Sequence, residues 1–484
     1  MKRFFLFVCL LTSVILQANA GGLVTNSNQS ATYYRMLARG ASISGDALYY
    51  NPAGLAFLDQ GFTISLNTQM IWMKRIINND LSTLNNPEFT GKLYVPFFPG
   101  LYAAYKTGNF TFSLGFNPPA GGGSIEFADG LPMLENTFSL MPKNVLNNST
   151  LGLITNGYQM QSMLKGTSIV YGVQAGAAYR INEMISVSGG VRMMFASNSY
   201  EGYAKDIEFN PSSAALTALG ITADGTMRSA PTFLNAYGRF LEGLGLLTEG
   251  ATMKALSDGA KNENLILDAK QKGSGIAPIF GVHFQVNSLN LAAKYEFNTK
   301  ITIKNETDPA KNAMNLYPDG KELRSDVPAL LSLAGSYDII PALKLSVTYL
   351  HHFEPQAKIE SWDGTKVVQR QDFIDKGTNE YQFGVEWKIT DKFTISTGCQ
   401  WSDVNVSDLW QNDITHNLDN LTFGLGAAYQ ISDRLTLNIG GLNTWYSPVT
   451  VKGAASIQGN FSTAYNQKYD RKNTAIAIGI DFKF

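Results

Sequence analysis

The histidines and short motifs of this chain do not form a pattern of catalytic chemistry. The histidines are His283, His351, His352 and His416. The adjacent pair 351–352 would point to opposite faces of a strand, which makes it a poor chelate for a metal. No Ser-His-Asp order, HExxH, phosphate-binding loop or CxxC motif is present. The sequence therefore predicts no catalytic residue, no metal site and no cofactor, and a protein that is not an enzyme.

The elements that carry the other polar side chains are predicted to be strands, and the C-terminus shows the pattern best. Small or polar residues occupy one face of residues 475–484, and the other face carries Ile476, Ile478, Ile480, Phe482 and Phe484. Period-two alternation is typical of a strand with one apolar face. The same pattern recurs along most of the chain, as expected for a closed barrel in an outer membrane.

The composition supports a barrel over the other classes. Charged residues make up 16 % of the 484 residues, the net charge is −1, and the mean hydropathy is −0.07. This excludes a broad basic surface, so no nucleic-acid partner is expected. It also excludes a bundle of membrane helices. Alternation averages the hydropathy to nearly zero while it still presents an apolar outer wall.

The first residues are predicted to be a signal peptide. Lys2 and Arg3 provide the positive start, 4–16 the apolar core, and 18–20 (Ala-Asn-Ala) the small-residue cleavage site. We expect Gly21 to be the mature N-terminus.

The two cysteines allow no intramolecular disulfide in the mature chain. Cys9 lies inside the predicted leader, so Cys399 is left alone. We expect Cys399 to be a small, outward-facing apolar residue.

The alternating segments number about fourteen, an even count as bacterial single-chain barrels require. They lie near 62–72, 92–106, 109–118, 167–180, 184–201, 273–286, 289–304, 327–338, 342–358, 379–390, 393–402, 421–431, 434–448 and 472–484. Short links alternate with long ones, which matches short periplasmic turns and long outer loops. The sequence thus predicts an all-β fold, an antiparallel transmembrane barrel with its C-terminus on the periplasmic side.

The alternation also predicts which side chains face lipid. In 379–390 the aromatic and aliphatic positions should face outward. In 289–304 we expect Ile301 and Ile303 to face lipid, and Lys294, Glu296 and Lys300 to face the lumen. The reverse orientation would place lysine in hydrocarbon, at a cost of about 2–4 kcal/mol near the midplane.

Two features do not fit a plain pore. Residues 21–60 are polar, rich in small residues and without a strong period. In addition, glycines recur on the predicted inner face, at Gly172, Gly176, Gly190, Gly384, Gly424, Gly426, Gly440 and Gly479. Glycine in a strand often marks the close approach of another backbone. A plug packed against these positions explains both features; the alternative is that the glycines ease bending or mark bulges. We therefore expect a signal peptide (1–20), a hatch (21–60) and a barrel (61–484).

The longest link, 202–272, contains two helix-like stretches, 211–219 and 230–261. The second has an apolar stripe at helical spacing, with Phe233, Tyr237 and Phe240 among its members. Such a stripe is expected to pack against the core of its own loop, although it could also form an apolar landing patch. This outer loop is thus predicted to be partly helical.

The segment 48–55 (LYYNPAGL), just before the first strand, resembles the FadL-type outer-membrane transporters, which include long-chain fatty acid transporters and TodX-like carriers of aromatic hydrocarbons. Its core is Asn51, Pro52, Ala53 and Gly54. The stretch 28–45 is similar to the hatch of that family, and 326–329 (Asp-Val-Pro-Ala) is similar to its strand openings. The resemblance extends over the whole mature chain.

The resemblance implies a plugged fourteen-stranded barrel in the outer membrane of a Gram-negative cell. In the family, outer loops catch the ligand, which leaves sideways through the wall at a kinked third strand. The candidate kink here is Asn117, Pro118, Pro119 and Gly121. Proline cannot donate a ladder hydrogen bond, so the sheet should open there; otherwise the strand simply ends.

A lumen cation should meet the ligand if the ligand is a carboxylate. The inward candidates are Arg180, Arg192, Lys294, Lys300 and Lys344, with Arg192 the strongest. The alternative for each is an ion pair in a wet lumen, such as Lys294 with Glu296.

The predicted function is passive uptake of long-chain fatty acids or other hydrophobic small molecules by a monomer embedded in outer-membrane lipid. The alternative is a FadL-like barrel that acts as a binding or shuttle component of a protein secretion system. An ordinary porin is disfavoured by the hatch-like segment. Lipid that co-purifies with the protein would separate carrier from scaffold.

Overall fold

The computed structural model describes residues 23–312, 315–457 and 460–484. The predicted signal peptide (1–20) and the predicted mature N-terminus, Gly21, lie outside these residues. Long antiparallel strands form the wall, and their bounds are β1 (Gly61–Asn79), β2 (Glu88–Thr107), β3 (Phe110–Phe127), β4 (Ile154–Arg180), β5 (Ile185–Ser212), β7 (Ile266–Val286), β8 (Leu289–Glu296), β9 (Thr302–Asn312), β10 (Glu322–Arg324), β11 (Leu330–Ile340), β12 (Leu343–His352), β15 (Asn379–Lys388), β16 (Phe393–Asp403), β17 (Asn420–Ser432), β18 (Leu435–Tyr446), β19 (Val449–Ile457) and β20 (Asn460–Lys483).

Helices and short strands lie inside the barrel or beyond its outer end. The helices are α1 (Ala31–Met36), α2 (Ala47–Tyr50), α3 (Pro132–Met141), α4 (Ala214–Ala218), α5 (Ala230–Gly243) and α6 (Leu247–Gly259). The short strands are β6 (Arg228–Ser229), β13 (Glu360–Trp362) and β14 (Val367–Gln369). None of the described helices is long and apolar enough to cross a membrane.

The wall closes because β1 pairs with β2 on one side and with β20 on the other. Three wall strands are interrupted and appear in two pieces. The first consists of β8 and β9, which both pair with β7. The second consists of β10, which pairs with β9, and β11, which pairs with β8. The third consists of β18 and β19, which both pair with β20. Counted this way, the described residues form a closed antiparallel barrel of 14 strands, which confirms the predicted fold class. Closure leaves no unpaired edge in lipid.

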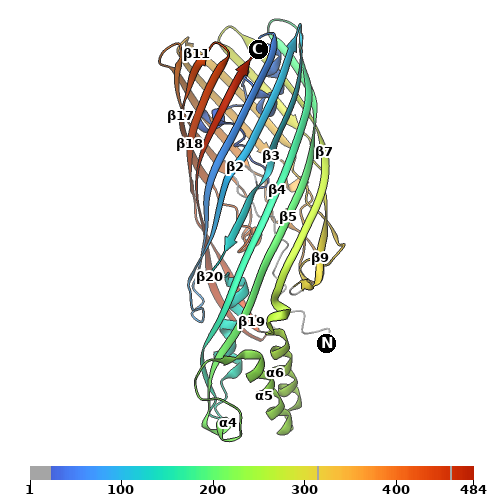
Figure 1. Cartoon of the computed structure of the whole chain (residues 1–484), viewed down its shortest axis with the longest axis vertical. Coiled ribbons are helices and arrows are strands. Elements are labelled where there is room, and N and C mark those ends of the chain that lie inside the picture. The colour runs from blue at the N-terminus through green and yellow to red at the C-terminus, as the bar shows by residue number, and fades with distance from the viewer. Residues whose placement is uncertain (1–22, 313–314, 458–459) are drawn as a thin grey trace.

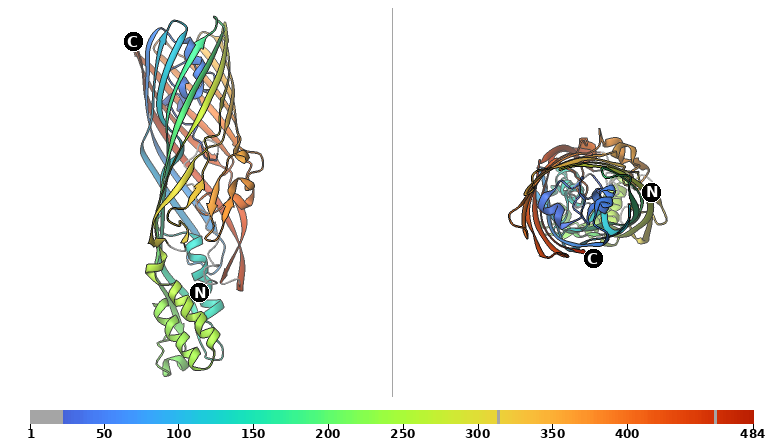
Figure 2. Two further views of the ribbon diagram at one scale, coloured as in Figure 1. Left: turned by 90° about the vertical axis from the view of Figure 1, so that its right-hand side faces the viewer. Right: turned by 90° about the horizontal axis from the view of Figure 1, so that it is seen from above.

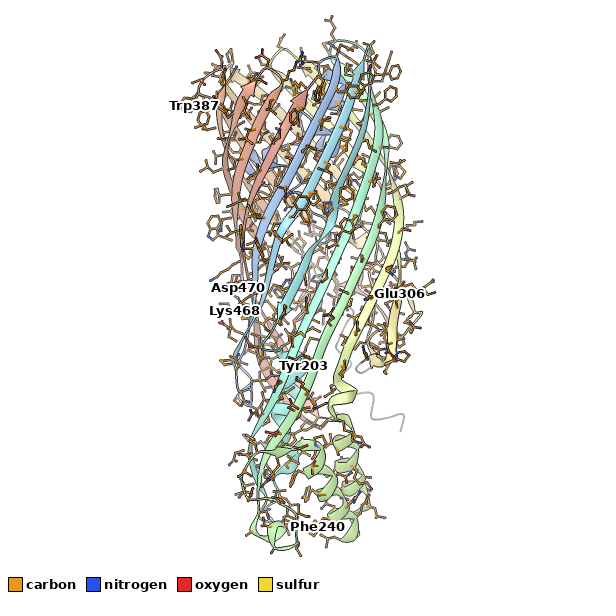
Figure 3. The ribbon with its side chains drawn as sticks, viewed as in Figure 1. Tyr203, Phe240, Glu306, Trp387, Lys468 and Asp470 are labelled. Carbon is orange, nitrogen blue, oxygen red and sulfur yellow. The ribbon has the colours of Figure 1, made fainter. Side chains whose placement is uncertain are left out.

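Apolar side chains cover one end of the wall and define the membrane band. Stacked aromatic pairs mark its outer edge, such as Trp72 with Tyr94 at 5.5 Å between ring centroids. A second ring lies beside the short turns, where Phe62 meets Tyr105 at 4.4 Å. Aromatic girdles of this kind flank the apolar band of outer-membrane barrels. Trp387 points outward at this end of the barrel (Figure 3), which is also the end where the C-terminus lies (Figure 1).

The opposite end of the barrel extends far beyond this band, and α4, α5 and α6 cap the longest strands (Figure 1). β4 and β5 have 27 and 28 residues, longer than predicted from 167–180 and 184–201. The extra residues do bury apolar side chains such as Ile207 and Phe209. Register shifts in the β4–β5 ladder, between Thr155 and Tyr158 and between Gln159 and Gln161, interrupt the period-two pattern there. The predicted stripe of the long outer loop packs on its own core, since Phe233 and Tyr237 are buried between α5 and its neighbours.

One predicted orientation is wrong. Lys300 is exposed on the outer face, whereas Ile301 and Ile303 are buried in the lumen beside Leu23. The ladder is interrupted between Glu296 and Thr302, and this break shifts the alternation by one residue. A change of one residue moves every later side chain to the other face.

Candidate ligand pathway through the barrel

Residues 23–60 lie inside the barrel at the membrane end; Figure 2 shows them in the lumen, seen from above. We call residues 23–60 the N-terminal segment. It is bound to the wall on several sides. Ala31 N donates to Asn67 Oδ1 at 2.9 Å, and Tyr102 Oη donates to Gln29 O at 3.0 Å. Lys106 Nζ donates to Ala56 O at 2.6 Å. These contacts hold the N-terminal segment against the inner face of the wall.

Five of the eight inner-face glycines lie against the N-terminal segment. A Cβ at Gly440 would lie 2.7 Å from Arg35 N, and one at Gly479 would lie 3.0 Å from Ala31 Cβ. Gly384, Gly424 and Gly426 also face residues 34–36. The sequence analysis missed Gly398, where a Cβ would clash with Met36 O. Because glycine has no Cβ, α1 can approach the wall closely at these positions. The other three predicted glycines, Gly172, Gly176 and Gly190, face other parts of the wall.

The Asn51–Gly54 motif connects the N-terminal segment to the barrel wall by hydrogen bonds and close packing. Asn51 Nδ2 donates to Ser42 O at 2.9 Å and lies 2.9 Å from His283 Nδ1 on β7. Pro52 begins the 3₁₀ helix η2 (Pro52–Phe57), and Ser186 Oγ donates to Ala53 O at 2.7 Å. At Gly54 there is no room for a Cβ, because it would clash with Ser42 O.

The candidate kink lies at an opening in the ladder between β2 and β3. The two strands pair up to Leu101↔Phe116 and again at Leu93↔Ile125, with no pairing between these points. β3 does not end at the prolines but continues to Phe127, still paired with β4. The sequence analysis missed Pro96 and Pro99, which remove donors from the β2 side of the same opening.

The kink turns inward and binds the N-terminal segment. Residues 117–122 are buried. Asn26 N donates to Pro119 O at 2.8 Å, and Asn117 Nδ2 donates to Gln29 Oε1 at 2.8 Å. Thr25 and Ala120 form an isolated antiparallel bridge. Gly121 has a φ of +74°, a conformation that glycine adopts without strain. Outside the opening, Phe97 is exposed in the apolar band.

A small cavity adjoins the kink, the N-terminal segment and the facing wall. Its lining includes Thr25, Pro119, Arg192, Met194, Lys294 and His352. Its volume is about 30 Å³, which is room for a few water molecules and not for a long acyl chain. A larger ligand can occupy this place only if the N-terminal segment or the wall moves.

Two of the predicted cations meet at this cavity. Arg192 Nη1 lies 2.5 Å from Glu296 Oε2, and Lys294 Nζ lies 2.6 Å from Glu296 Oε1. Both cations also face the ring of Tyr49, at 4.8 and 5.2 Å from its centroid. All three charged groups are buried. Two cations therefore share one carboxylate, which gives this group of three side chains an excess of one positive charge.

The other predicted cations are elsewhere. Arg180 is at the turn end of the barrel, where its guanidinium lies 5.1 Å from the centroid of the Phe57 ring. Lys300 is on the outer face, so its predicted inward orientation is wrong. Lys344 is half-buried, 3.6 Å from Asp338.

Sequence reasoning missed a second polar cluster beside the cavity. Leu23 N donates to Glu354 Oε1 at 2.5 Å, Thr25 Oγ1 lies 3.1 Å from His352 Nδ1, and Ser27 Oγ donates to Glu380 Oε2 at 3.1 Å. Alternate residues of the N-terminal segment thus bind three buried titratable groups. The alternation of 379–390 predicts that Glu380 faces inward. It does not predict that Glu380 binds Ser27.

The chain belongs to a known family. Residues 155–484 match the family described as outer membrane protein transport protein (OMPP1/FadL/TodX). With its closed barrel, it is therefore an outer-membrane protein of the FadL/TodX class of transport proteins. No curated protein sequence matches it.

Solved structures share the fold at low sequence identity. A Pseudomonas aeruginosa FadL homologue is 13 % identical, with a TM-score of 0.64, over 96 % of this chain and 100 % of the other. The Ralstonia pickettii toluene transporter TbuX is 14 % identical (TM-score 0.54; 95 % and 99 % covered). The P. putida toluene transporter TodX is 13 % identical (TM-score 0.53; 91 % and 94 % covered). The family match does not favour the secretion alternative.

Proposed function

We propose that this protein carries long-chain fatty acids or other hydrophobic small molecules passively across the outer membrane. The observation that carries the proposal is the opening between β2 and β3, which the inward kink and the N-terminal segment together close. A lumen closed at this point has a side exit into the membrane once the contact is broken. Membership of a transport family supports this reading.

Partition free energy supplies the driving force for capture. Each buried methylene contributes about 0.8 kcal/mol, so an acyl chain binds readily and its release is the difficult step. A cavity of about 30 Å³ has no room for such a chain, so binding at this place requires a movement. Displacement of Thr25 and its neighbours from Ala120 would enlarge the cavity and free the opening at the same time.

The buried cations suit a ligand with an acidic head. Arg192 and Lys294 share Glu296, so an incoming carboxylate would supply the second negative charge. A charge-assisted hydrogen bond to a buried guanidinium is among the stronger polar contacts. Neutral hydrocarbons would use the apolar walls alone.

A disulfide lock tests whether the N-terminal segment must leave the kink. Antiparallel bridge partners have Cα atoms about 4.5–5.5 Å apart, within the range of a disulfide. We therefore replace Thr25→Cys and Ala120→Cys in a Cys399→Ser background, in cells without another such transporter. Uptake of a radiolabelled long-chain fatty acid should stop after oxidation and return after reduction.

The control staples two neighbouring wall strands on their outer face, with Val385→Cys and Thr397→Cys, which are register partners. That disulfide should leave uptake unchanged. Undiminished uptake by the oxidised Thr25–Ala120 lock would rule out the side exit as proposed.

A further inference from the structure

Three lysines stand side by side on the outer face of neighbouring strands. In the ladders, Lys74 on β1 lies directly opposite Lys92 on β2 and also opposite Lys472 on β20. All three side chains are exposed. We call Lys74, Lys92 and Lys472 the lysine row. Like charges directly opposite each other in a sheet are destabilising, so packing alone does not account for this arrangement.

No ion pair compensates the lysine row within the described residues. The nearest acidic positions are Glu126, opposite Lys92, and Asp470, two residues from Lys472 along β20; Figure 3 shows Asp470 on the outer side. Neither lies within ion-pair distance of the row. Elsewhere on the outer face such pairs do form, as between Lys272 and Glu306 at 2.8 Å. The row therefore carries net positive charge.

The height of the lysine row places it at the level of lipid headgroups. Lys74 and Lys92 lie two residues beyond Trp72 and Tyr94, the stacked pair at the outer edge of the apolar band. Two strand residues rise by about 7 Å. On the other side, Lys472 lies directly opposite Trp445. Aromatic girdles sit at the membrane interface, so the ammonium groups stand just above it, in the outer leaflet.

The rim is not uniformly basic. Outward lysines also occur on β7 and β9, where Lys272 lies opposite Lys304, but there Lys272 forms an ion pair with Glu306 at 2.8 Å. Two residues beyond Trp401, a girdle residue on β16, stands Asp403. Basic residues at the rim are thus not a general property of the barrel. The row is a local site on β2, β1 and β20, beside the opening between β2 and β3.

We propose that the lysine row binds the phosphate groups of a phosphorylated lipid of the outer leaflet, of the lipid A type, while Trp72, Tyr94 and Trp445 contact its acyl region. Lysine ammonium groups are common phosphate ligands. A bound anionic headgroup would attract all three ammonium groups and so offset the repulsion between them.

Native mass spectrometry of the full mature protein in mild detergent tests the site. Lipid A and its dephosphorylated form are the probes. The variant Lys74→Gln/Lys92→Gln/Lys472→Gln should bind lipid A about 100-fold more weakly, at about fivefold for each lysine. The dephosphorylated probe should bind wild type and variant alike. Lys74→Gln alone should bind lipid A about fivefold more weakly than wild type.

The matched control removes three outward lysines from β7 and β9, as Lys270→Gln/Lys272→Gln/Lys304→Gln, and should leave lipid A binding within about twofold, because this patch has its own ion pair. Without lipid, the row variant should be slightly more heat-stable than wild type, because the repulsion is gone; a structural role would give the opposite sign. Equal lipid A binding by wild type and row variant, or equal binding of both probes by wild type, would overturn the proposal.

Discussion

At the scale of single residues, the buried charges decide what the lumen can hold. Arg192, Lys294 and Glu296 form one cluster with an excess of one positive charge. Removal of one partner from a buried pair is costly because it strands a charge. Substitution of Arg192, however, leaves Lys294 paired with Glu296, so the fold should survive the test.

We expect Arg192→Gln to weaken the binding of a long-chain fatty acid by about 2 kcal/mol, the size of one charged hydrogen bond. A neutral hydrocarbon such as toluene should bind as before. Titration of both ligands in detergent measures the difference. Arg180→Gln is the control, because Arg180 lies outside the cavity. An equal loss for both ligands would refute the role of Arg192 as a headgroup partner.

Gly440 and Gly441 are adjacent on β18, and Gly440 lies on the inner face while Gly441 lies on the outer face. A Cβ at Gly440 would lie 2.7 Å from Arg35 N, whereas one at Gly441 would lie 3.7 Å from its nearest neighbour. Gly440→Ala should therefore destabilise the seated N-terminal segment by about 1–3 kcal/mol, as overpacking does, and should raise single-channel conductance. Gly441→Ala should behave as wild type. If Gly440→Ala left the conductance unchanged, α1 would not need the close approach that glycine allows at this position.

At the scale of elements, the β16–β17 loop (404–419) is bound to the barrel wall beyond the membrane. Two arginines that face each other across β1 and β20 bind its backbone: Arg75 donates to Ile414 O, and Arg471 donates to His416 O. Asp413 joins this loop to α3, because Met133 N donates to its Oδ2 at 2.7 Å. The loop is therefore held against β1, β20 and α3.

Burial raises the pKa of Asp413 from its usual 3.8 to about 6, although Met133 N, Gln467 and Tyr469 donate to it. Because the folded state keeps its proton up to about pH 6, stability falls as pH rises from about 4 to 6, by about 3 kcal/mol in all. The pKa of His416 is held well below its usual 6.5 by burial and by Arg75 and Arg471. Its contribution therefore has the opposite sign: the unfolded state takes up a proton as the pH falls below about 6.5, so stability falls there.

The variant His416→Gln removes the opposing titration. In this background, hydrogen-exchange protection of residues 404–419, corrected for intrinsic rates, should be greater at pH 5 than at pH 7.5. In His416→Gln/Asp413→Asn the two protection values should agree. A His416→Gln variant that is better protected at the higher pH would contradict the raised pKa of Asp413.

At the scale of the whole molecule, the barrel is a closed ring of strands whose lumen contains residues 23–60. Deletion of residues 23–60 should raise small-solute conductance, because the glycine-lined inner face then borders water. Planar-bilayer recordings measure the change. The control replaces the helical tip, 214–261, with a short linker and should leave conductance low, since the tip lies beyond the lumen (Figure 1). No rise after the first deletion would show that another segment, such as the β16–β17 loop, closes the tube.

The sequence by itself determined the strand count, the direction of most side chains and the class of protein. Alternation is local, and a wall between lipid and lumen imposes it on nearly every strand. It also located the kink at Asn117–Gly121 and the inner-face glycines, because proline and glycine declare a backbone constraint at their own position.

Only the tertiary structure decided which groups meet. Glu354 and Leu23 are 331 residues apart in the chain, and Arg192 and Glu296 are 104 residues apart; no periodic pattern encodes such pairings. Lys300 shows the limit most plainly, since one break in the ladder reversed its direction. The register between strands is a long-range property, fixed by the pairing of whole strands, and it alone assembled the cavity, the shared carboxylate and the lysine row.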